Sequence, residues 1–294
     1  MKILLLGKNG QVGWELQRSL APLGELIALA REEADLEDLN GLRQCIQQHK
    51  PDVIVNAGAY TAVDKAESEP EKAKRINAEA AGVMAEEAQK IQAWLIHYST
   101  DYVFDGTKNT PYKVEDPTNP LSVYGKTKLE GEEQIRQHSP KHLIFRTSWV
   151  YAARGNNFAK TMLRLASERE ALSVVADQIG APTSAELIAD VTALAIYRIS
   201  TQQNAEALSG TYHLVASGET SWHGYAQYVL ELAKEKGIAL KVEPKNVQAI
   251  NTEDYPTPAA RPKNSRLNTQ SLTDTFNIVL PDWRYHVKRM IEEI

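Results

Sequence analysis

The sequence predicts an α/β fold, in which a doubly wound parallel sheet is followed by a smaller C-terminal portion. Three observations support this fold class. Short apolar runs alternate with helical stretches in the first half, a glycine-rich turn follows the first run, and the alternation becomes irregular after residue 147. At 294 residues, 43% of them hydrophobic, the chain is long enough to bury a substantial core.

The first half alternates predicted strands with predicted helices. Apolar runs predict buried strands at 3–6, 26–30, 53–57, 94–98 and 143–147. Apolar residues at helical spacing predict helices over 11–20, 39–49 and 71–90. Because strands and helices alternate, right-handed crossovers would make the strands parallel and place helices on both faces of the sheet.

The second half is less regular. Strands are predicted at 172–175 and 212–215, and the proline-rich run 246–268 is predicted to form one long functional loop. We expect residues 1–147 to form the sheet domain. Residues 148–294 would form mainly a second domain that covers the ligand crevice, with 177–200 as the segment that could return to the sheet.

The composition excludes several classes of function. A net charge of -5 and a pI of about 5.9 argue against nucleic acid as a partner, because polyanion-binding proteins carry a basic surplus. Cys45 is the single cysteine, so neither an intramolecular disulfide nor a cysteine-rich metal site can form. No apolar run approaches the ~20 residues of a membrane span, and the run after Met1 is too short for a signal sequence. We therefore expect a cytoplasmic protein without a membrane partner.

The glycine-rich turn, Gly7-x-x-Gly10-Gln11-Val12-Gly13, lies between the first strand and the first helix. Glycines allow a sharp turn and a close approach of the backbone to a pyrophosphate, while the helix N-terminus offers free N–H groups. The pattern is typical of a Rossmann-type dinucleotide-binding domain, with an ordinary strand–helix turn as the alternative. We expect Gly7, Gly10, Gln11, Val12 and Gly13 to bind the cofactor.

The end of the second strand bears on the choice between NADPH and NADH. An acidic residue there usually binds a ribose 2′-hydroxyl, whereas an arginine accommodates a 2′-phosphate. The strand ends at Arg31, which favours NADPH or tolerance of it, although the acids beside it leave a solvated arginine as the alternative. Asp35 is predicted to accept a hydrogen bond from the adenine amine, and Leu36 to pack against the adenine face.

A Tyr-x-x-x-Lys pair, Tyr124 and Lys128, begins a polar helix and places both side chains on one helix face. A nearby ammonium favours the phenolate, so we expect Lys128 to lower the pKa of Tyr124 toward the range useful for proton transfer. Thr100 and Asp101 follow an apolar strand at its carboxyl end, where ligands of such sheets bind. Thr100 is therefore predicted to hold a substrate carbonyl beside Tyr124, with a local turn as the alternative.

Together these motifs resemble those of the extended short-chain dehydrogenases/reductases, and more closely the reductases that complete dTDP-L-rhamnose synthesis. The resemblance covers nearly the whole chain. The stretches that carry it are 7–14, 55–64, 97–106, 123–131, 145–151, 177–183 and 258–267. Thr100, Tyr124 and Lys128 match the family's catalytic set position by position.

The resemblance also implies roles that spacing alone does not. The residues implied to line the cofactor beyond the third strand are Ala57, Gly58, Ala59, Tyr60 and Thr61, with Tyr98 beneath the nicotinamide. Those implied to contact the substrate are Asp101, Tyr102 and Trp149 at the sugar, and Arg261 and Arg266 at the diphosphate, where a surface turn is the alternative for both arginines.

Some family members are similar in holding a divalent cation at a subunit contact. Glu15, Glu186 and Asp190 are carboxylates that would suit Mg²⁺ in a homodimer, with solvated helix acids as the equal alternative.

The expected activity is reduction by NADPH or NADH of the C4 keto group of a dTDP-linked 4-keto-6-deoxy-L-hexose. Two other readings stay open. One is a sugar-nucleotide epimerase or dehydratase of the same superfamily, which would keep its cofactor tightly bound. The other is a non-catalytic protein resembling the regulatory subunit of methionine adenosyltransferase, because fold does not settle function.

Overall fold

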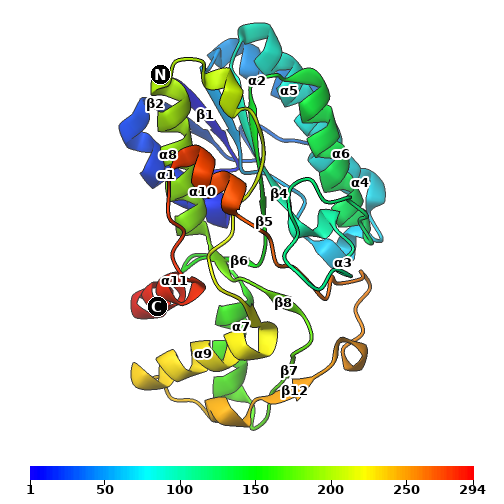
Figure 1. Cartoon of the computed structure of the whole chain (residues 1–294), viewed down its shortest axis with the longest axis vertical. Helices are drawn as coiled ribbons and strands as arrows, with labels where there is room; N and C mark the ends of the chain where they lie inside the picture. The colour runs from blue at the N-terminus through cyan, green and yellow to red at the C-terminus, as the bar shows by residue number, and fades with distance from the viewer.

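The centre of the computed structural model, which describes residues 1–294, is a six-stranded parallel sheet (Figure 1). Its order is β10-β5-β4-β3-β1-β2. The strands are β1 (Lys2–Leu6), β2 (Glu25–Leu29), β3 (Val53–Asn56), β4 (Trp94–Thr100), β5 (His142–Thr147) and β10 (Gly210–His213). Every neighbouring pair is parallel, which confirms the predicted fold class.

Helices cover both faces of the sheet, because successive residues of each strand point to opposite sides. Ile3 and Leu5 of β1 belong to one hydrophobic core, whereas Leu4 and Leu6 belong to another. The helices on the first face include α1 (Gln11–Leu20), η1 (Ala21–Leu23), α8 (Ala185–Thr201), η4 (Ala205–Leu208) and α10 (Gln270–Phe276). Those on the second face include α2 (Leu39–His49), α3 (Val63–Ala66), α4 (Pro70–Lys74), α5 (Ala80–Ile91) and α6 (Val123–His138).

The remaining elements form a smaller lobe beyond the carboxyl ends of the strands (Figure 1). Its helices are α7 (Phe158–Glu168), α9 (Trp222–Glu235), η5 (Pro244–Asn246), η6 (Thr252–Asp254) and α11 (Trp283–Glu293). The short helix η3 (Asp101–Val103) instead follows β4 directly and packs against α6. Its short strand pairs are β6 (Val150–Tyr151) with β9 (Thr183–Ser184), β7 (Ser173–Val175) with β12 (Gln248–Ile250), and β8 (Ile179–Gly180) with β11 (Thr220–Ser221). A third hydrophobic core joins α7, α9 and β7.

Two segments of the second half belong to the central sheet. The strand predicted at 212–215 is β10, which pairs with β5 through Tyr212 and Phe145. Helix α8 lies against α1, so residues 185–201 cover the same face as the first helix. The division at residue 147 stays a prediction. We propose that the sheet unit comprises 1–147 with α8 and β10, and that the small lobe is built from chain segments that precede α8 and that follow β10.

The helix predicted over 71–90 is interrupted by a π-helical turn, η2 (Arg75–Glu79). Buried Asn77 lies in this turn and contacts two other segments. Its Oδ1 accepts from Tyr60 N at 2.9 Å, and its Nδ2 donates to Tyr60 O at 3.2 Å and to Thr127 Oγ1 at 3.1 Å. The turn thereby ties the segment after β3 to α6. The predicted loop 246–268 also differs, because it contains β12 and η6.

The order of strands reverses direction at β1, which has β2 on one side and β3 on the other. In open α/β sheets, ligands bind at such a switch point, outside the carboxyl ends of the strands. The fold therefore places the binding crevice where Gly7 ends β1 and Gly58 follows β3. No helix of the structure combines the length and the apolar character needed to cross a membrane.

Candidate active site

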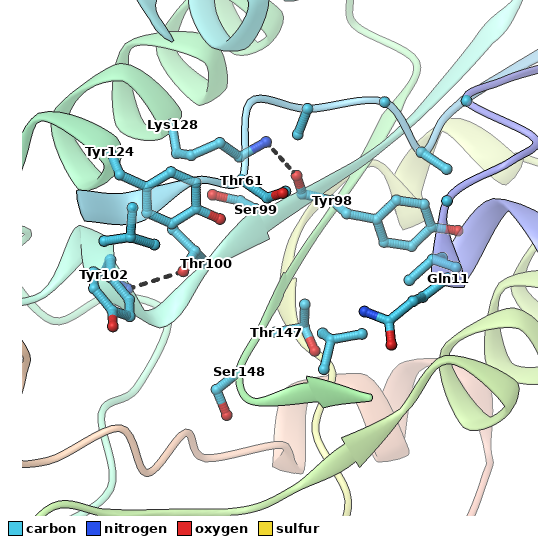
Figure 2. A pocket seen from close by; sticks show the side chains of 18 of the residues that line it. Gln11, Thr61, Tyr98, Ser99, Thr100, Tyr102, Tyr124, Lys128, Thr147 and Ser148 are labelled. Atoms are coloured by element: carbon cyan, nitrogen blue, oxygen red, sulfur yellow. Dashed lines mark hydrogen bonds between the residues drawn. The ribbon is translucent and has the colours of Figure 1, made fainter. Parts of the chain in front are cut away.

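A cavity of about 660 Å³ opens at the carboxyl ends of β1, β3, β4 and β5, which is a size typical of small-molecule sites (Figure 2). It brings together most of the residues that the sequence assigns to the cofactor and substrate. Those are Gly7, Gly10, Gln11, Val12, Arg31, Ala57, Gly58, Ala59, Thr61, Tyr98, Thr100, Asp101, Tyr102, Tyr124, Lys128 and Trp149. The lining residues that the sequence analysis missed are Asn9, Glu32, Val63, Ser99, Thr147, Ser148 and Val150.

The glycine turn has the geometry that a pyrophosphate requires. Gly7 has a positive φ of 84°, and a Cβ on it would lie 2.7 Å from Gly58 N. Gly10 is the N-cap of α1 and supplies no side-chain cap, so the N–H groups of the first turn remain available to an anion. Gly13 does not line the cavity. A Cβ on it would come within 2.1 Å of Gly7 O, so its role is close packing of helix against turn.

The predicted adenine end forms a smaller cavity of about 140 Å³. Arg31, Asp35 and Leu36 all line it. The Arg31 side chain is 61% exposed and pairs with Asp35 at 3.2 Å and with Glu37. Arg31 thus lines this cavity but is already bound by two carboxylates, and its contact with a 2′-phosphate stays a prediction.

Tyr60 lies away from the cavity, unlike its neighbours Ala59 and Thr61. Its side chain packs in the core of the second face, and its hydroxyl donates to Glu69 at 2.7 Å. Asn77 binds both the N–H and the C=O of Tyr60, and the expectation that Tyr60 contacts the cofactor stays a prediction.

The Thr100, Tyr124 and Lys128 side chains converge on the cavity from two elements (Figure 2). Thr100 ends β4, and Tyr124 and Lys128 lie one turn apart in α6. That helix begins after Ser122, whose Oγ accepts from Gly125 N at 3.1 Å, so the cap sets the start of the helix and the direction of Tyr124.

The environment of Tyr124 differs from the expectation. Burial raises its pKa above the ordinary value, and a hydrogen bond with Thr100 opposes this in part. Lys128 is not among the groups that shift it. Its Nζ donates to Tyr98 O at 2.6 Å (Figure 2) and lies 3.1 Å from His97 Nε2. The predicted lowering of the Tyr124 pKa by Lys128 is therefore absent from this arrangement. Burial lowers the pKa of Lys128 itself to about 8.

Asp101 is a buried carboxyl beside the reacting groups. Its Oδ1 accepts from Thr100 Oγ1 at 3.1 Å, and Thr100 Oγ1 accepts in turn from Tyr102 N at 3.2 Å. Burial raises the pKa of Asp101 to about 6. The Thr100 hydroxyl therefore contacts both the Asp101 carboxyl and the Tyr124 hydroxyl.

The predicted sugar wall is formed by two aromatic side chains. Trp149 has a positive φ of 49°, which a bulky residue rarely adopts, and its ring stacks on Trp222 with centroids 3.7 Å apart. Tyr102 meets Tyr124 edge to face, with centroids 5.6 Å apart. Both residues line the cavity, and their contact with the sugar stays a prediction.

The two arginines expected at the diphosphate have different surroundings. Arg261 donates to Tyr102 Oη at 3.3 Å and pairs with Asp64, which places it at the rim of the cavity. Arg266 instead donates to Asn264 Oδ1 and to the Asn109 carbonyl, each at 2.8 Å, and does not line the cavity. Neither arginine is among the residues that line the cavity, and the diphosphate assignment of both stays a prediction. The contacts of Arg266 hold neighbouring loops together.

The predicted Mg²⁺ ligands are already paired with arginines. Glu15 and Asp190 both contact Arg18, at 3.5 and 2.9 Å, and Glu186 contacts Arg289 at 2.8 Å. No group of three or more His, Cys, Asp or Glu side chains in the chain could hold a metal ion. The structure thus does not support a metal site made by Glu15, Glu186 and Asp190 within one chain.

Two polar residues behind the cavity escaped the sequence analysis. Asn56 and His97 are both about 1% exposed and contact each other between β3 and β4. Each interrupts an otherwise apolar strand, and that interruption is the signal that could have identified them.

The fold and the Thr-Tyr-Lys set together are those of a dinucleotide-dependent enzyme of the short-chain dehydrogenase/reductase type. The free N–H groups after Gly10 and the close backbone approach at Gly7 and Gly58 fit such a cofactor. The family model described as "RmlD substrate binding domain" matches residues 1–294, and the chain belongs to this family.

Relatives of known name agree over the whole length. The dTDP-4-dehydrorhamnose reductase of Salmonella typhimurium is 55% identical over 298 residues, spanning 100% of this chain and 98% of that protein. The crystal structure of a dTDP-4-dehydrorhamnose reductase from Clostridium acetobutylicum is similar with a TM-score of 0.91 and 37% identity, covering 100% of this chain and 99% of that one. The enzyme from Bacillus anthracis, solved in complex with NADP, has a TM-score of 0.88 and 35% identity with the same coverage.

Proposed function

We propose that the protein reduces the C4 keto group of dTDP-4-dehydro-L-rhamnose with NADPH or NADH, giving dTDP-L-rhamnose. The observation that carries this proposal is the convergence of Thr100, Tyr124 and Lys128 at the switch-point cavity. Full-length identity of 55% to a named dTDP-4-dehydrorhamnose reductase supports the choice of substrate.

The nicotinamide cofactor, when bound, supplies the hydride that adds to C4. Gly7, Gly10 and the first turn of α1 would hold its pyrophosphate, Arg31 would hold the 2′-phosphate of NADPH, and Tyr98 would contact the nicotinamide. The side chains therefore have to place the substrate carbonyl and provide one proton.

Tyr124 donates its hydroxyl proton to the oxygen of the C4 carbonyl as that oxygen gains negative charge. Thr100 orients the Tyr124 hydroxyl, and Lys128 as an ammonium would stabilise the tyrosinate that remains. Trp149 and Tyr102 enclose the sugar ring and exclude water. Arg261 at the rim pairs with the diphosphate, so binding energy from this remote group positions C4.

Consumption of NADPH and NADH against a panel of dTDP-, GDP- and UDP-linked 4-keto sugars tests the proposal. We expect stoichiometric oxidation of the cofactor with the dTDP sugar and formation of a 4-hydroxy product. An epimerase or dehydratase would instead purify with tightly bound cofactor and show no net consumption. A non-catalytic binding protein would not couple NADPH oxidation to any sugar. The expected cytoplasmic location and homodimer stay predictions.

A further inference from the structure

A buried hydrogen-bond chain runs behind the cavity through Asn56, His97 and Lys128. Asn56 Nδ2 lies 3.1 Å from His97 Nδ1, and His97 Nε2 lies 3.1 Å from Lys128 Nζ. None of the three residues is more than 2% exposed. Water therefore cannot supply alternative partners, and each contact must match a donor with an acceptor.

The backbone N–H of Gly58 determines which group donates and which accepts in each of these hydrogen bonds. Gly58 N lies 3.1 Å from Asn56 Oδ1, and a backbone N–H can only donate. The oxygen of the Asn56 amide must therefore face Gly58, which leaves its NH₂ group facing His97. Because that NH₂ group can only donate, His97 Nδ1 must accept, and the hydrogen of the neutral imidazole lies on Nε2.

The Nε2–H of His97 therefore points at Lys128 Nζ. An ammonium has no lone pair and would place two donors 3.1 Å apart. A neutral amine can accept from Nε2–H and still donate to Tyr98 O. A doubly protonated His97 is excluded by the same reasoning, because its Nδ1–H would meet the NH₂ of Asn56. Burial also holds the pKa of His97 well below its ordinary value.

We propose that His97 is a positioning residue that favours the neutral amine of Lys128, so that the fraction of Lys128 present as an ammonium rises when negative charge enters the cavity. As an ammonium, Lys128 loses its acceptor role toward His97 and is free to turn toward Tyr124. The source of that charge, a dinucleotide, rests on the proposed function, whereas the protonation states do not.

The other ionisable groups around Lys128 do not reverse this assignment. On α6, Glu132 favours the ammonium and Tyr124 is uncharged at neutral pH. From β5, Arg146 binds both carboxylate oxygens of Glu132, at 2.9 and 2.7 Å, and so neutralises it. From β4, His97 is neutral. Burial is the dominant influence on Lys128 and favours the neutral amine.

The tautomer of His97 can be measured on the protein without added ligand. Long-range ¹H–¹⁵N correlation spectra above pH 8.5 should show His97 with hydrogen on Nε2 and a bare Nδ1, assigned by loss of the signals in His97→Leu. The opposite tautomer would overturn the proposal, because Nε2 would then accept from a Lys128 ammonium. This readout does not depend on any cofactor.

Proton uptake on cofactor binding is the second readout. Calorimetric titration with NADPH at pH 9, in buffers of different ionisation enthalpy, should show uptake of about 0.9 proton per chain, because a group of pKa about 8 is largely neutral there. Lys128→Met should abolish the uptake. Uptake that persists in Lys128→Met, or is absent from the unsubstituted protein, would overturn the proposal. Failure of NADPH to bind would count against the proposed function alone.

The direction in which the midpoint of proton uptake shifts in His97→Leu shows whether His97 donates to Lys128 or accepts from it. Removing a donor to the neutral amine should raise the pKa of Lys128, so His97→Leu should move the midpoint of the uptake curve upward by roughly 0.5–1 pH unit. If His97 instead accepts from an ammonium, the midpoint moves downward. His213→Leu is the matched control, since His213 is also a fully buried histidine but contacts the Asn268 carbonyl, and it should leave the midpoint unchanged.

Discussion

Arg261 Nη2 lies 2.7 Å from Asp64 Oδ2, which joins the C-terminal proline-rich segment to the short helix α3 that follows β3. The carboxylate holds the guanidinium at the rim of the cavity, beside the Tyr102 hydroxyl. A diphosphate entering the cavity would compete with Asp64 for this arginine.

Arg261→Ala should raise the KM for the nucleotide sugar by tenfold or more and leave NADPH affinity unchanged. A lost charge-assisted contact costs roughly 1.5–3 kcal/mol, which corresponds to that factor. Asp64→Asn distinguishes binding of the diphosphate from anchoring of the loop, because it removes the ion pair with Arg261 but keeps the arginine. If it raises the KM as much as Arg261→Ala does, Arg261 only anchors the loop. Arg266→Ala should leave the KM nearly unchanged.

Tyr124→Phe should reduce turnover by about 10²–10⁴-fold with little change in NADPH binding, because general acid catalysis is typically worth that much. The phenyl ring keeps the packing against Tyr102 and removes only the hydroxyl. Single-turnover rates and NADPH affinity measured on the same preparation separate the two effects. Turnover close to that of the unsubstituted protein would exclude Tyr124 as the proton donor.

Arg31→Ala should weaken NADPH binding more than NADH binding. The loss should lie near the lower end of the usual 1.5–3 kcal/mol, because the guanidinium must first leave Asp35 and Glu37. Titrations of both cofactors into the variant measure the ratio. Arg18→Ala, an exposed arginine far along α1, serves as the control and should change neither affinity. Equal losses for the two cofactors would place the 2′-phosphate elsewhere.

Relative to the wild type, Asp101→Asn should be more stable at pH 7.5 than at pH 4. Burial raises the folded-state pKa of Asp101 from an ordinary 3.8 to about 6, so the folded state binds more protons in that window. Its contribution to stability is therefore present at low pH and is lost as pH rises through about 6.

The amide cannot ionise, so the difference in unfolding free energy between variant and wild type should grow by up to about 3 kcal/mol between the two pH values. Urea denaturation at each pH measures it. Asp105→Asn should show the opposite trend, because hydrogen bonds from Thr107 and Tyr112 hold the pKa of Asp105 below its ordinary value. A pH-independent difference for Asp101→Asn would contradict the assignment.

The sheet is predictable where burial leaves a local signature in the sequence. Strands buried on both faces appear in the sequence as unbroken apolar runs, so β3 lies within the predicted range 53–57. The helical spacing of apolar residues likewise predicts α2 with its observed bounds of 39–49. The position of β10 is not predictable in this way, because its place in the sheet depends on pairing with β5, more than sixty residues earlier in the chain. Local periodicity carries no information about that partner.

The sequence predicts which residues form the site better than it predicts how their side chains are oriented. Motif spacing brings Thr100, Tyr124 and Lys128 to one cavity, because strand ends and helix turns fix where backbones lie. The direction of the Lys128 side chain depends on the buried His97 of β4. The direction of the Arg266 side chain depends on Asn264 of its own loop. Such pairings follow from packing in three dimensions, which the spacing of a motif does not encode.

The π-helical turn at Arg75–Glu79 makes the length of this stretch a constraint on evolution. A π turn accommodates one residue more than an α-helix does, so deleting one residue would regularise the helix. The same deletion would rotate Asn77 by about 100° around the helix axis, away from Tyr60 and Thr127. An insertion or deletion between α4 and α5 would therefore unlink the loop after β3 from the helix that carries Tyr124.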